Sequence, residues 1–552
     1  MVHRLALLPL LLLLTGSLAL AAPEGEFRVE GQSGNNAQGW AAIGEQPNGG
    51  LLVDRLVNGT RLRGVLSANN GTWSGRLVRS GGASGALAAS GSGHTFDLIL
   101  TPRQGSDRDL DADWVERQSP TRILRGRARW QRVSPASTLG SSPLMASVTR
   151  NALRTAGKGN VPRELMLTKA GNQVDPQLLI EGPQIFARAA AMIEAAEEEV
   201  LIQTFHWAPS QAADTLMAGL KALETRRRAA GATTPIRVRF VVDRNRILKA
   251  LRHTERDLKA NLRATQLDPS FVQVEVESHT HWLYGALHSK LFVVDGRHAM
   301  ITGANVNDWA EAPKTWYELG LVVHGPVVEG LRAEFAQLWN KKHGSPLAAL
   351  QTPSLPASGP GVPVLITSRK SRGNVFQDND DNPASQSYFA ALRSAQSHVR
   401  IMTPHLNDDD VRRELIACLR RGVRVELVLS KGFGLARAKL PFQGGNNTKT
   451  LGRLYRRLKN HPAALARFQV RWFSRDGQSP ISTEENNSHA KYMTCDDRVA
   501  IIGCSNLDEQ SFNHSREVNL VIEDPSLTRG FDRQAFLPVY GRSIPVDLSA
   551  LK

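Results

Sequence analysis

The residues of this sequence that could carry out chemistry occur in two matched sets. One H-x-K-x-x-x-x-D motif begins at His288 and a second begins at His489. Residue frequencies predict only about 0.2 copies of such a motif in a chain of 552 residues, so two copies are not an accident of composition. Because alternate residues of a β-strand point to the same side, each His and its Lys should share one face. The members are His288, Lys290 and Asp295 in the first motif and His489, Lys491 and Asp496 in the second.

Each motif is followed by an asparagine and a glutamate. Asn305 and Glu318 follow the first motif, and Asn506 and Glu517 follow the second. A carboxylate that accepts the Nδ1–H of a histidine fixes its tautomer and aims its Nε2 atom, which is the role we expect for the two glutamates. The alternative for both is an ordinary charge at a strand edge.

These residue types are those required to cleave a phosphodiester without a metal. A neutral imidazole can attack phosphorus and form a phosphohistidine, while a second imidazole moves the proton of the leaving and entering oxygens. Lysine and asparagine side chains can hold the non-bridging oxygens as charge grows on them. The two motif aspartates sit at expected hairpin turns, where they should brace loops and lysines rather than touch substrate. We therefore predict a site without metal or cofactor, with catalytic-site residues His288, Lys290, Asp295, His489, Lys491, Asp496, Glu318 and Glu517 and phosphate-binding residues Lys290, Asn305, Lys491 and Asn506.

An internal repeat of helices and strands positions the motifs. Helices with a 3.6-residue apolar period alternate with strands of β-branched residues, which predicts α/β layers. We place the first half at 165–346, a linker rich in Pro, Ser and Gly at 347–365, and the second half at 366–546. The expected matching strands are 200–204 and 399–403, 236–242 and 423–429, and 271–274 and 467–470.

The N-terminal part differs from the repeat. Arg4, the apolar run 5–14 and the small residues before position 23 predict a secretory signal peptide at 1–22. Residues 23–135 contain short alternating runs and regularly spaced Asn-Gly pairs, which predict a small antiparallel β-sandwich or barrel, followed by a linker at 136–164. No later stretch is apolar over about 18 residues, so we expect an exported chain, periplasmic or extracellular, without a transmembrane segment.

The composition is globular with a strong positive charge. Hydrophobic residues make up 41% and charged residues 22%, which excludes a disordered tail, a collagen-like fibre and a multi-span membrane protein. The net charge of +16 suggests phospholipid headgroups, nucleic acid or a cell envelope as partner, with a solubility bias as the alternative. Three cysteines argue against a disulfide framework, and no Cys/His set has zinc-binding spacing.

The twin motifs with their downstream Asn and Glu residues resemble the phospholipase D superfamily over about residues 165–546. This resemblance implies an α/β fold of two pseudo-two-fold-related halves that share one cleft, here preceded by a small antiparallel β domain. It also implies that His288 is the nucleophile, that His489 is the general acid and base, and that the lysines and asparagines bind phosphate. The segment 302–304 departs from the Gly-Ser or Gly-Gly usual in the family, which would affect local turn shape. Two motifs in one chain imply a complete site in a monomer.

The phosphodiester itself is left open by the sequence. Segments 278–284 and 431–442 mix basic, imidazole and aromatic residues, which favours loops at an anionic lipid surface, and packed loops are the alternative. Segment 505–512 resembles the second-motif region of bacterial cardiolipin synthases, whereas the expected export without a membrane span resembles the secreted bacterial phospholipases D. We predict an exported phosphodiesterase that hydrolyses or transfers phospholipid headgroups.

Two further activities and one non-enzymatic role compete with this prediction. The alternatives are a metal-independent endonuclease, with nucleic acid as the second-choice partner, and a cardiolipin synthase-like phosphatidyltransferase. An envelope-binding protein with decayed sites is a third hypothesis, and the intact motifs argue against it.

Overall fold

We describe the fold from a computed structural model. The chain divides into two compact units, residues 1–141 and 142–552, which are treated separately. The expected signal peptide, most of the linker at 347–365 and residues 436–442 lie outside the described residues. The structure describes the backbone of residues 25–31, 39–45, 51–57, 60–69, 72–79, 95–102, 109–119 and 122–134, and residues 142–157, 159–245, 253–281, 284–343, 347, 350, 361–374, 380–435 and 443–551.

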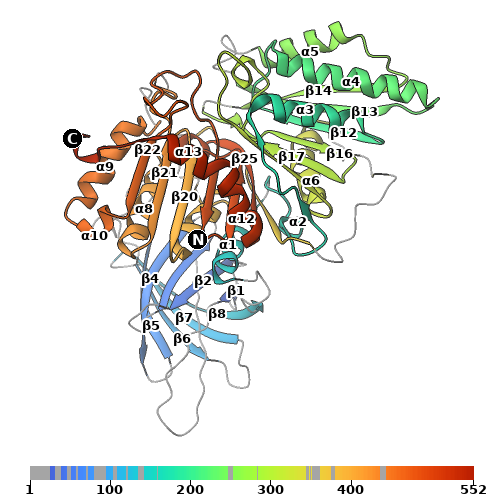
Figure 1. Ribbon diagram of the computed structural model, residues 1–552. Coiled ribbons are helices and arrows are strands. Elements are labelled where there is room, and N and C mark those ends of the chain that lie inside the picture. The colour runs from blue at the N-terminus through green and yellow to red at the C-terminus, as the bar shows by residue number, and fades with distance from the viewer. Residues whose placement is uncertain are drawn as a thin grey trace. The chain divides into compact units, whose positions relative to one another are not determined.

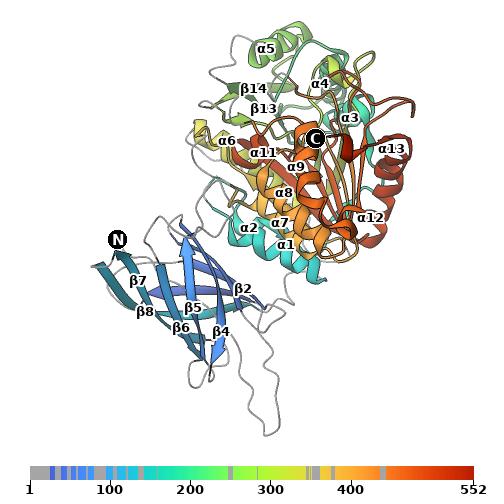
Figure 2. The same cartoon turned by 90° about the vertical axis from the view of Figure 1, so that its left-hand side faces the viewer.

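The first unit is a closed barrel of eight antiparallel strands (Figure 2). Each strand pairs with the next in sequence, and β1 pairs with β8 to close the barrel. Only an Asn-Gly pair separates β3 from β4 and β4 from β5, as expected for tight hairpins. Of the two predicted architectures, the structure has the barrel. Its strands are β1 (Gly25–Gly31), β2 (Gly39–Glu45), β3 (Leu51–Val57), β4 (Thr60–Asn69), β5 (Thr72–Arg79), β6 (Thr95–Pro102), β7 (Asp109–Ser119) and β8 (Arg122–Ser134).

The first half of the second unit is a mixed sheet between helices. The strand order is β10-β18-β17-β16-β12-β13-β14, and β11 also pairs with β18. Helices α3, α4 and α5 lie on one face and α6 lies on the other (Figure 1). The elements are β10 (Gln173–Val174), β11 (Leu179–Ile180), α3 (Glu181–Glu194), β12 (Glu199–Thr204), α4 (Gln211–Ala229), β13 (Ile236–Asn245), α5 (Thr254–Thr265), β14 (Val272–His281), β16 (Leu291–Val294), β17 (His298–Thr302), β18 (Leu319–His324) and α6 (Val327–His343).

The second half repeats this plan. Its sheet has the order β26-β22-β21-β20-β23-β24-β25-β19-β9, in which β20 to β25 occupy the places of β12 to β18. Helices α7 and α8 pack on one face, and α12 and α13 pack on the other (Figures 1 and 2). The elements are β19 (Val364–Arg369), α7 (Pro383–Ser394), β20 (His398–Thr403), α8 (Asp409–Arg420), β21 (Arg424–Leu429), α9 (Asn447–Leu458), β22 (Phe468–Trp472), β23 (Tyr492–Cys495), β24 (Val499–Gly503), α11 (Glu509–Asn513), β25 (Ser515–Glu523), α12 (Pro525–Phe531), a π-helical turn η5 (Asp532–Phe536), α13 (Leu537–Arg542) and β26 (Ile544–Pro545).

The predicted fold class of two α/β halves is confirmed, and the matched strands fall where the repeat placed them. The segment expected to be a linker at 136–164 differs. Its described part contains α1 (Pro143–Arg154), which packs on α7, and β9 (Leu167–Thr168) then pairs with β19 of the second half. Nine residues of α1 are buried, because an apolar stripe on this helix needs a partner surface. None of the helices in the described ranges is long and apolar enough to cross a bilayer.

Candidate active site

Both motif histidines lie where the two halves meet. His288 follows β15 (Ala286–Leu287), which runs parallel to the start of β25, and its backbone N–H donates to the carbonyl of Arg516 at 3.0 Å. His489 is held in the same way in the other direction, since its backbone N–H donates to the carbonyl of Tyr317 at 2.9 Å. Each histidine is therefore fixed beside the residue that precedes the glutamate of the opposite half.

Each imidazole pairs with the carboxylate of the other half. The Nδ1 atom of His288 lies 2.9 Å from Oε1 and 3.1 Å from Oε2 of Glu517. The Nδ1 atom of His489 lies 2.5 Å from Oε1 of Glu318. Both glutamates are almost fully buried, at 1% exposure or less. Because Nδ1 of each ring is held by a carboxylate, Nε2 is the nitrogen that we expect to carry out the chemistry.

The motif lysines are buried beside the histidines. The Nζ atom of Lys290 donates to the carbonyl of His288 at 2.6 Å, and Nζ of Lys491 donates to the carbonyl of His489. Both lysines are at most 2% exposed. A Cβ atom added to Gly303 would lie 2.7 Å from Oε2 of Glu318 and 3.4 Å from Nζ of Lys491. Glycine at this position therefore lets the carboxylate and the ammonium group approach each other.

The two downstream asparagines are also buried. Asn305 is 7% exposed and Asn506 is 3% exposed, and the Oδ1 atom of each has no hydrogen-bond partner among the described residues. The Nδ2 atom of Asn506 donates to Asp508 at 3.1 Å. Buried amide groups are normally hydrogen-bonded. The unpaired Oδ1 atoms of these two asparagines therefore indicate a ligand-binding site rather than a purely structural core.

Burial changes the ionisation of this cluster. It raises the pKa of Glu318 to about 7, although Lys491 and Lys290 act in the opposite direction. It raises the pKa of Glu517 to about 8 against the effect of Lys290. Burial also lowers the pKa of Lys491 to about 7, opposed by Glu318. Burial at this site thus disfavours isolated charges, and a bound anionic phosphate would favour the protonated lysine.

Asp295 and Asp496 are not brought to the histidines, although they complete the motif and stood in the predicted catalytic set. Strand β16 lies between His288 and Asp295, which stand seven positions apart, and seven residues of extended chain span about 20 Å. Asp295 accepts the backbone N–H groups of residues 197–199 at 2.8–2.9 Å. Asp496 accepts those of residues 396–398 at 2.8–3.1 Å. Both carboxylates therefore brace the loop before a central strand.

Comparison with known proteins tests the family. The family model described as "Cardiolipin synthase, PLD-like domain" matches residues 190–339 and 388–535, which together are more than half of the chain. The chain belongs to the phospholipase D superfamily. The duplicated match coincides with the two α/β halves, and it confirms the family resemblance seen in the twin motifs.

Individual relatives of this phospholipase D-like chain carry related names. It is 27% identical over 380 residues to Cardiolipin synthase A of Pseudomonas putida, covering 66% of this chain and 67% of the relative. It is 24% identical over 250 residues to Cardiolipin synthase 2 of Bacillus cereus, covering 44% of this chain and 43% of that relative. The crystal structure of phosphatidylserine synthase from Haemophilus influenzae shares the fold, with a TM-score of 0.50 and 16% identity over 74% of this chain and 93% of that one.

Aromatic residues outside the twin motifs pack against the two phospholipase D-type histidines. The ring centroids of Trp316 and Phe433 lie 4.3 and 5.1 Å from that of His489. Phe205 lies 5.1 Å from the ring of His288. Trp316 could have been found from the sequence, because it stands two positions before Glu318 in the segment that leads into β18, and alternate residues of an extended chain point to the same side.

The predicted lipid-facing loop at 431–442 is described only to residue 435. Phe433 is 6% exposed and packs on His489, as in the packed-loop alternative, whereas Leu435 is 40% exposed.

The intervening motif residue Ser289 is fully buried and accepts a hydrogen bond from Gln203, so it faces away from its histidine as the strand period predicts. Cys504 links the halves, since its Sγ accepts the backbone N–H of Lys290 at 3.1 Å.

Proposed function

We propose that this protein is a phosphatidyltransferase, which moves the phosphatidyl group of a phospholipid to an alcohol through a phosphohistidine intermediate. The observation that carries the proposal is the reciprocal pairing of His288 with Glu517 and of His489 with Glu318 in one seam. The names of the cardiolipin synthase and phosphatidylserine synthase relatives support lipid headgroup exchange as the reaction class.

In the first step the Nε2 atom of His288 attacks the phosphorus of the lipid. The new P–N bond forms as the bond from phosphorus to the headgroup oxygen breaks. His489, protonated at Nε2, gives its proton to that oxygen, so the headgroup leaves as a neutral alcohol. Lys290, Lys491 and the two asparagine amides hold the non-bridging oxygens while charge develops on them.

In the second step an acceptor alcohol attacks the same phosphorus. His489, now neutral, takes the acceptor's proton as the new P–O bond forms and the P–N bond breaks. This returns both histidines to their starting states. Water in place of the alcohol would give phosphatidic acid, so the balance between transfer and hydrolysis depends on what reaches the phosphohistidine. The aromatic rings of Trp316 and Phe433 around His489 would limit access of water at this stage.

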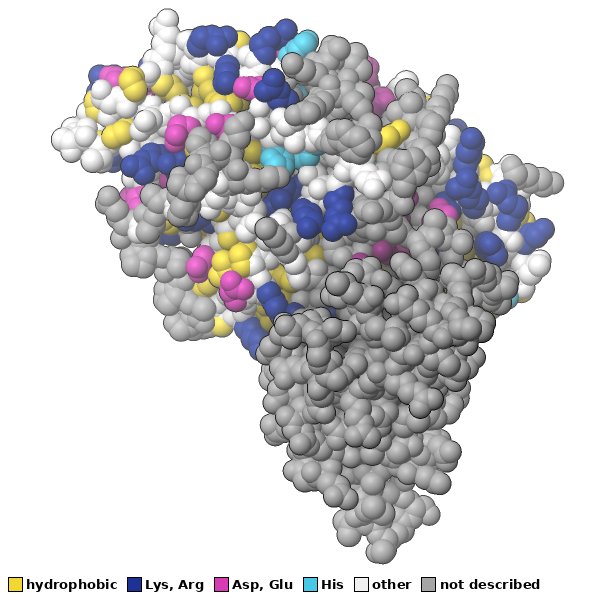
Figure 3. All heavy atoms as spheres, turned by 180° about the vertical axis from the view of Figure 1, so that it is seen from behind, with side chains coloured by type: hydrophobic (Ala, Val, Ile, Leu, Met, Phe, Trp, Pro, Cys, Tyr) yellow, Lys and Arg dark blue, Asp and Glu magenta, His cyan; other side chains and the backbone are white. Residues whose placement is uncertain are grey.

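The charge on one face of the molecule fits a phospholipid surface better than one defined groove for nucleic acid. On the face shown in Figure 3, the described Lys and Arg side chains lie in several groups with Asp and Glu between them. A distributed positive surface attracts an anionic bilayer over a broad area. Export of the chain through residues 1–22 is part of the same proposal, with an envelope phospholipid as the substrate.

Headgroup exchange with an isotopically labelled acceptor tests the proposal. Purified full-length protein would be incubated with phosphatidylglycerol vesicles and deuterated glycerol, and in parallel with phosphatidylcholine vesicles and with plasmid DNA. We expect deuterated phosphatidylglycerol by mass spectrometry, and none with the His288→Ala variant. Phosphatidic acid alone, at every glycerol concentration, would identify a hydrolase and reject the transferase. Cleavage of DNA without any lipid turnover would replace the proposal by a metal-independent nuclease.

A further inference from the structure

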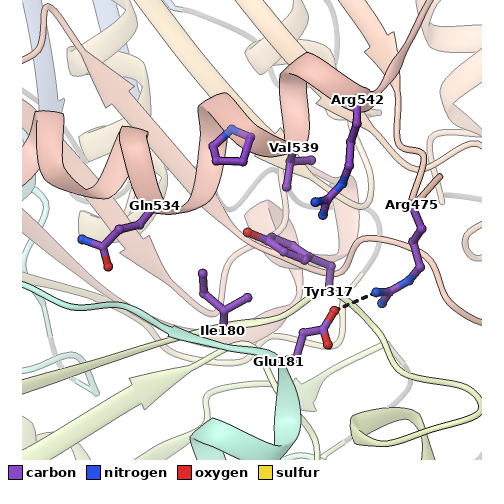
Figure 4. Close-up of a pocket in the computed structure, with 8 residues that line it drawn as sticks. Ile180, Glu181, Tyr317, Arg475, Gln534, Val539 and Arg542 are labelled. Carbon is purple, nitrogen blue, oxygen red and sulfur yellow. Dashed lines mark hydrogen bonds and ion pairs between the residues drawn. The ribbon is translucent and has the colours of Figure 1, made fainter. Parts of the chain in front are cut away.

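A hollow of about 320 Å³ lies between the two halves. It is on the opposite side from His489 of the segment that leads into β18. Trp316 and Glu318 face His489, so Tyr317 between them points the other way, into the hollow. Figure 4 shows Tyr317 in the middle of the lining residues, with Arg475 and Arg542 approaching from the second half. The lining residues are Ile180, Glu181, Tyr317, Arg475, Gln534, Pro538, Val539 and Arg542.

The equivalent place behind His288 is filled by a salt bridge. The carbonyls of Tyr317 and Arg516 receive the backbone N–H groups of His489 and His288, so these two residues correspond in the repeat. Arg516 reaches across to α6 of the first half, and its Nε and Nη2 atoms lie 2.7 and 2.9 Å from the two oxygens of Glu334. At the corresponding position the Tyr317 hydroxyl donates to the carbonyl of Ala535 at 3.3 Å, its ring lies 5.9 Å from the guanidinium carbon of Arg542, and the hollow remains beside it.

The charges around the hollow are unbalanced. Arg475 is occupied, because it pairs with Glu181 at 2.7 Å and donates to the carbonyls of Thr315 and Asn486. Arg542 has no carboxylate of its own among the described residues, and its buried Nε atom lacks a hydrogen-bond partner there. Two guanidinium groups thus face one carboxylate, while Ile180 and Val539 supply an apolar wall.

We propose that this hollow binds a small phosphate-bearing anion with a short carbon body, which takes the place that the Glu334 carboxylate fills on the other side. A guanidinium presents donors in a fork that suits phosphate oxygens, and a buried donor without an acceptor gains a full charge-assisted hydrogen bond from such a ligand. The volume is that of a small-molecule site, larger than a bare anion needs, and the apolar wall can cover the carbon body.

The site is connected to the catalytic seam through the backbone. The N–H of Glu181 donates to the carbonyl of Glu318 at 3.0 Å, and Arg475 holds the chain three residues before His489 and three before Glu318. A ligand that attracts the guanidinium of Arg475 would therefore shift the segments that carry His489 and Glu318. Occupancy should change the proton-transfer half of the reaction rather than the attack by His288.

Equilibrium dialysis of the full-length His288→Ala protein tests the site without turnover, so the result does not depend on the proposed activity. Radiolabelled sn-glycerol 3-phosphate and monomeric dihexanoyl phosphatidic acid are the two probes. Because the motif lysines can also hold a phosphate, we expect two bound equivalents. Adding Arg542→Met should weaken one of them by about tenfold or more. The matched control is Arg533→Met, which removes an exposed arginine on η5 that does not line the hollow and should leave both equivalents unchanged.

A second variant moves the affinity the other way. Glu181→Gln removes the carboxylate that occupies Arg475, so the probe should bind several-fold more tightly, and this variant decides the matter if Arg542→Met does not fold. Dependence on Arg542 with the lipid probe alone would identify a lipid phosphate as the ligand, and dependence with glycerol phosphate alone would identify a free headgroup phosphate. Equal binding by the Arg542→Met and Arg533→Met proteins, or unchanged or weaker binding by Glu181→Gln, would overturn the proposal.

Discussion

The Nδ1 atom of His288 lies 2.9 Å from Oε1 of Glu517, although 229 positions separate the two residues. The second pair, His489 with Glu318, crosses the seam in the opposite direction. Each half thus supplies the histidine of one pair and the glutamate of the other. Correct docking of the halves is therefore a condition for aiming either imidazole, and a shift of one half against the other would disturb both at once.

Replacing a glutamate of these pairs should slow chemistry without removing a reacting group. Glu517→Gln keeps the shape but lets the His288 ring lose its fixed tautomer, and we expect a fall in kcat of about 10²–10⁴-fold. Single-turnover formation of the phosphohistidine is the measurement. Glu517→Asp keeps the charge and should recover part of the loss. An unchanged rate in Glu517→Gln would show that the pair has no role in orientation.

The raised pKa of Glu517 makes a prediction about stability and pH. Burial raises this pKa from 4.5 to about 8, so the folded protein holds a proton that the unfolded chain releases between these values. Linkage then requires that the stabilisation of the folded state by protonated Glu517 be fully present below pH 4.5 and be lost as pH rises to about 8. Denaturant unfolding from pH 5 to 8 should show wild type losing stability relative to Glu517→Gln. A constant difference across this range would contradict the shift.

The role of His489 can be separated from that of His288 by the choice of leaving group. A p-nitrophenyl phosphodiester expels a stable anion that needs no protonation, so His489→Ala should still release p-nitrophenol in a burst and leave the adduct on His288. His288→Ala should release none. Peptide mass spectrometry at neutral or alkaline pH locates the phosphohistidine. An adduct found on His489 in the wild-type protein would reverse the two roles.

The parts of the site that the sequence could predict are those encoded by local spacing. The strand period placed His288 and Lys290 on one face and Ser289 on the other, and the repeat placed the matched strands. The sequence pointed to both glutamates, but it did not predict that each one pairs with the histidine of the other half. No local pattern shows which of two equivalent segments lies opposite a histidine. For the same reason α1 was assigned to a linker. Its partner α7 lies over 200 residues further along, and only folding brings the two together.

The motif aspartates should prove to be structural. Burial acts to raise the pKa of Asp496, but the backbone N–H groups of residues 396–398 overcome it and hold the pKa below its usual range. Asp496→Asn should therefore cost about 1–3 kcal/mol in the free energy of unfolding, since an amide is a weaker acceptor of these bonds. Its kcat at temperatures well below the melting point should stay within a few-fold of wild type. The stabilisation should also fade in the wild type as pH falls through the depressed pKa. A large loss of kcat in a fully folded Asp496→Asn protein would return this residue to the catalytic set.

The salt bridge between Arg516 and Glu334 should be the strongest polar contact holding the halves in register. Both side chains are at most 4% exposed, and the pair is bidentate. Removing one partner leaves a buried charge uncompensated, so Arg516→Met or Glu334→Leu should each lower the free energy of unfolding by about 3–5 kcal/mol. The double variant Arg516→Met/Glu334→Leu should recover much of this loss, because it leaves no charge behind. An exposed pair, Lys314 with Asp308, provides the control, and Lys314→Met should leave the free energy of unfolding close to that of wild type. Denaturant unfolding of wild type, the two single variants and the double variant gives the coupling energy. If the double variant loses as much stability as the two single variants together, the two side chains do not act as a pair.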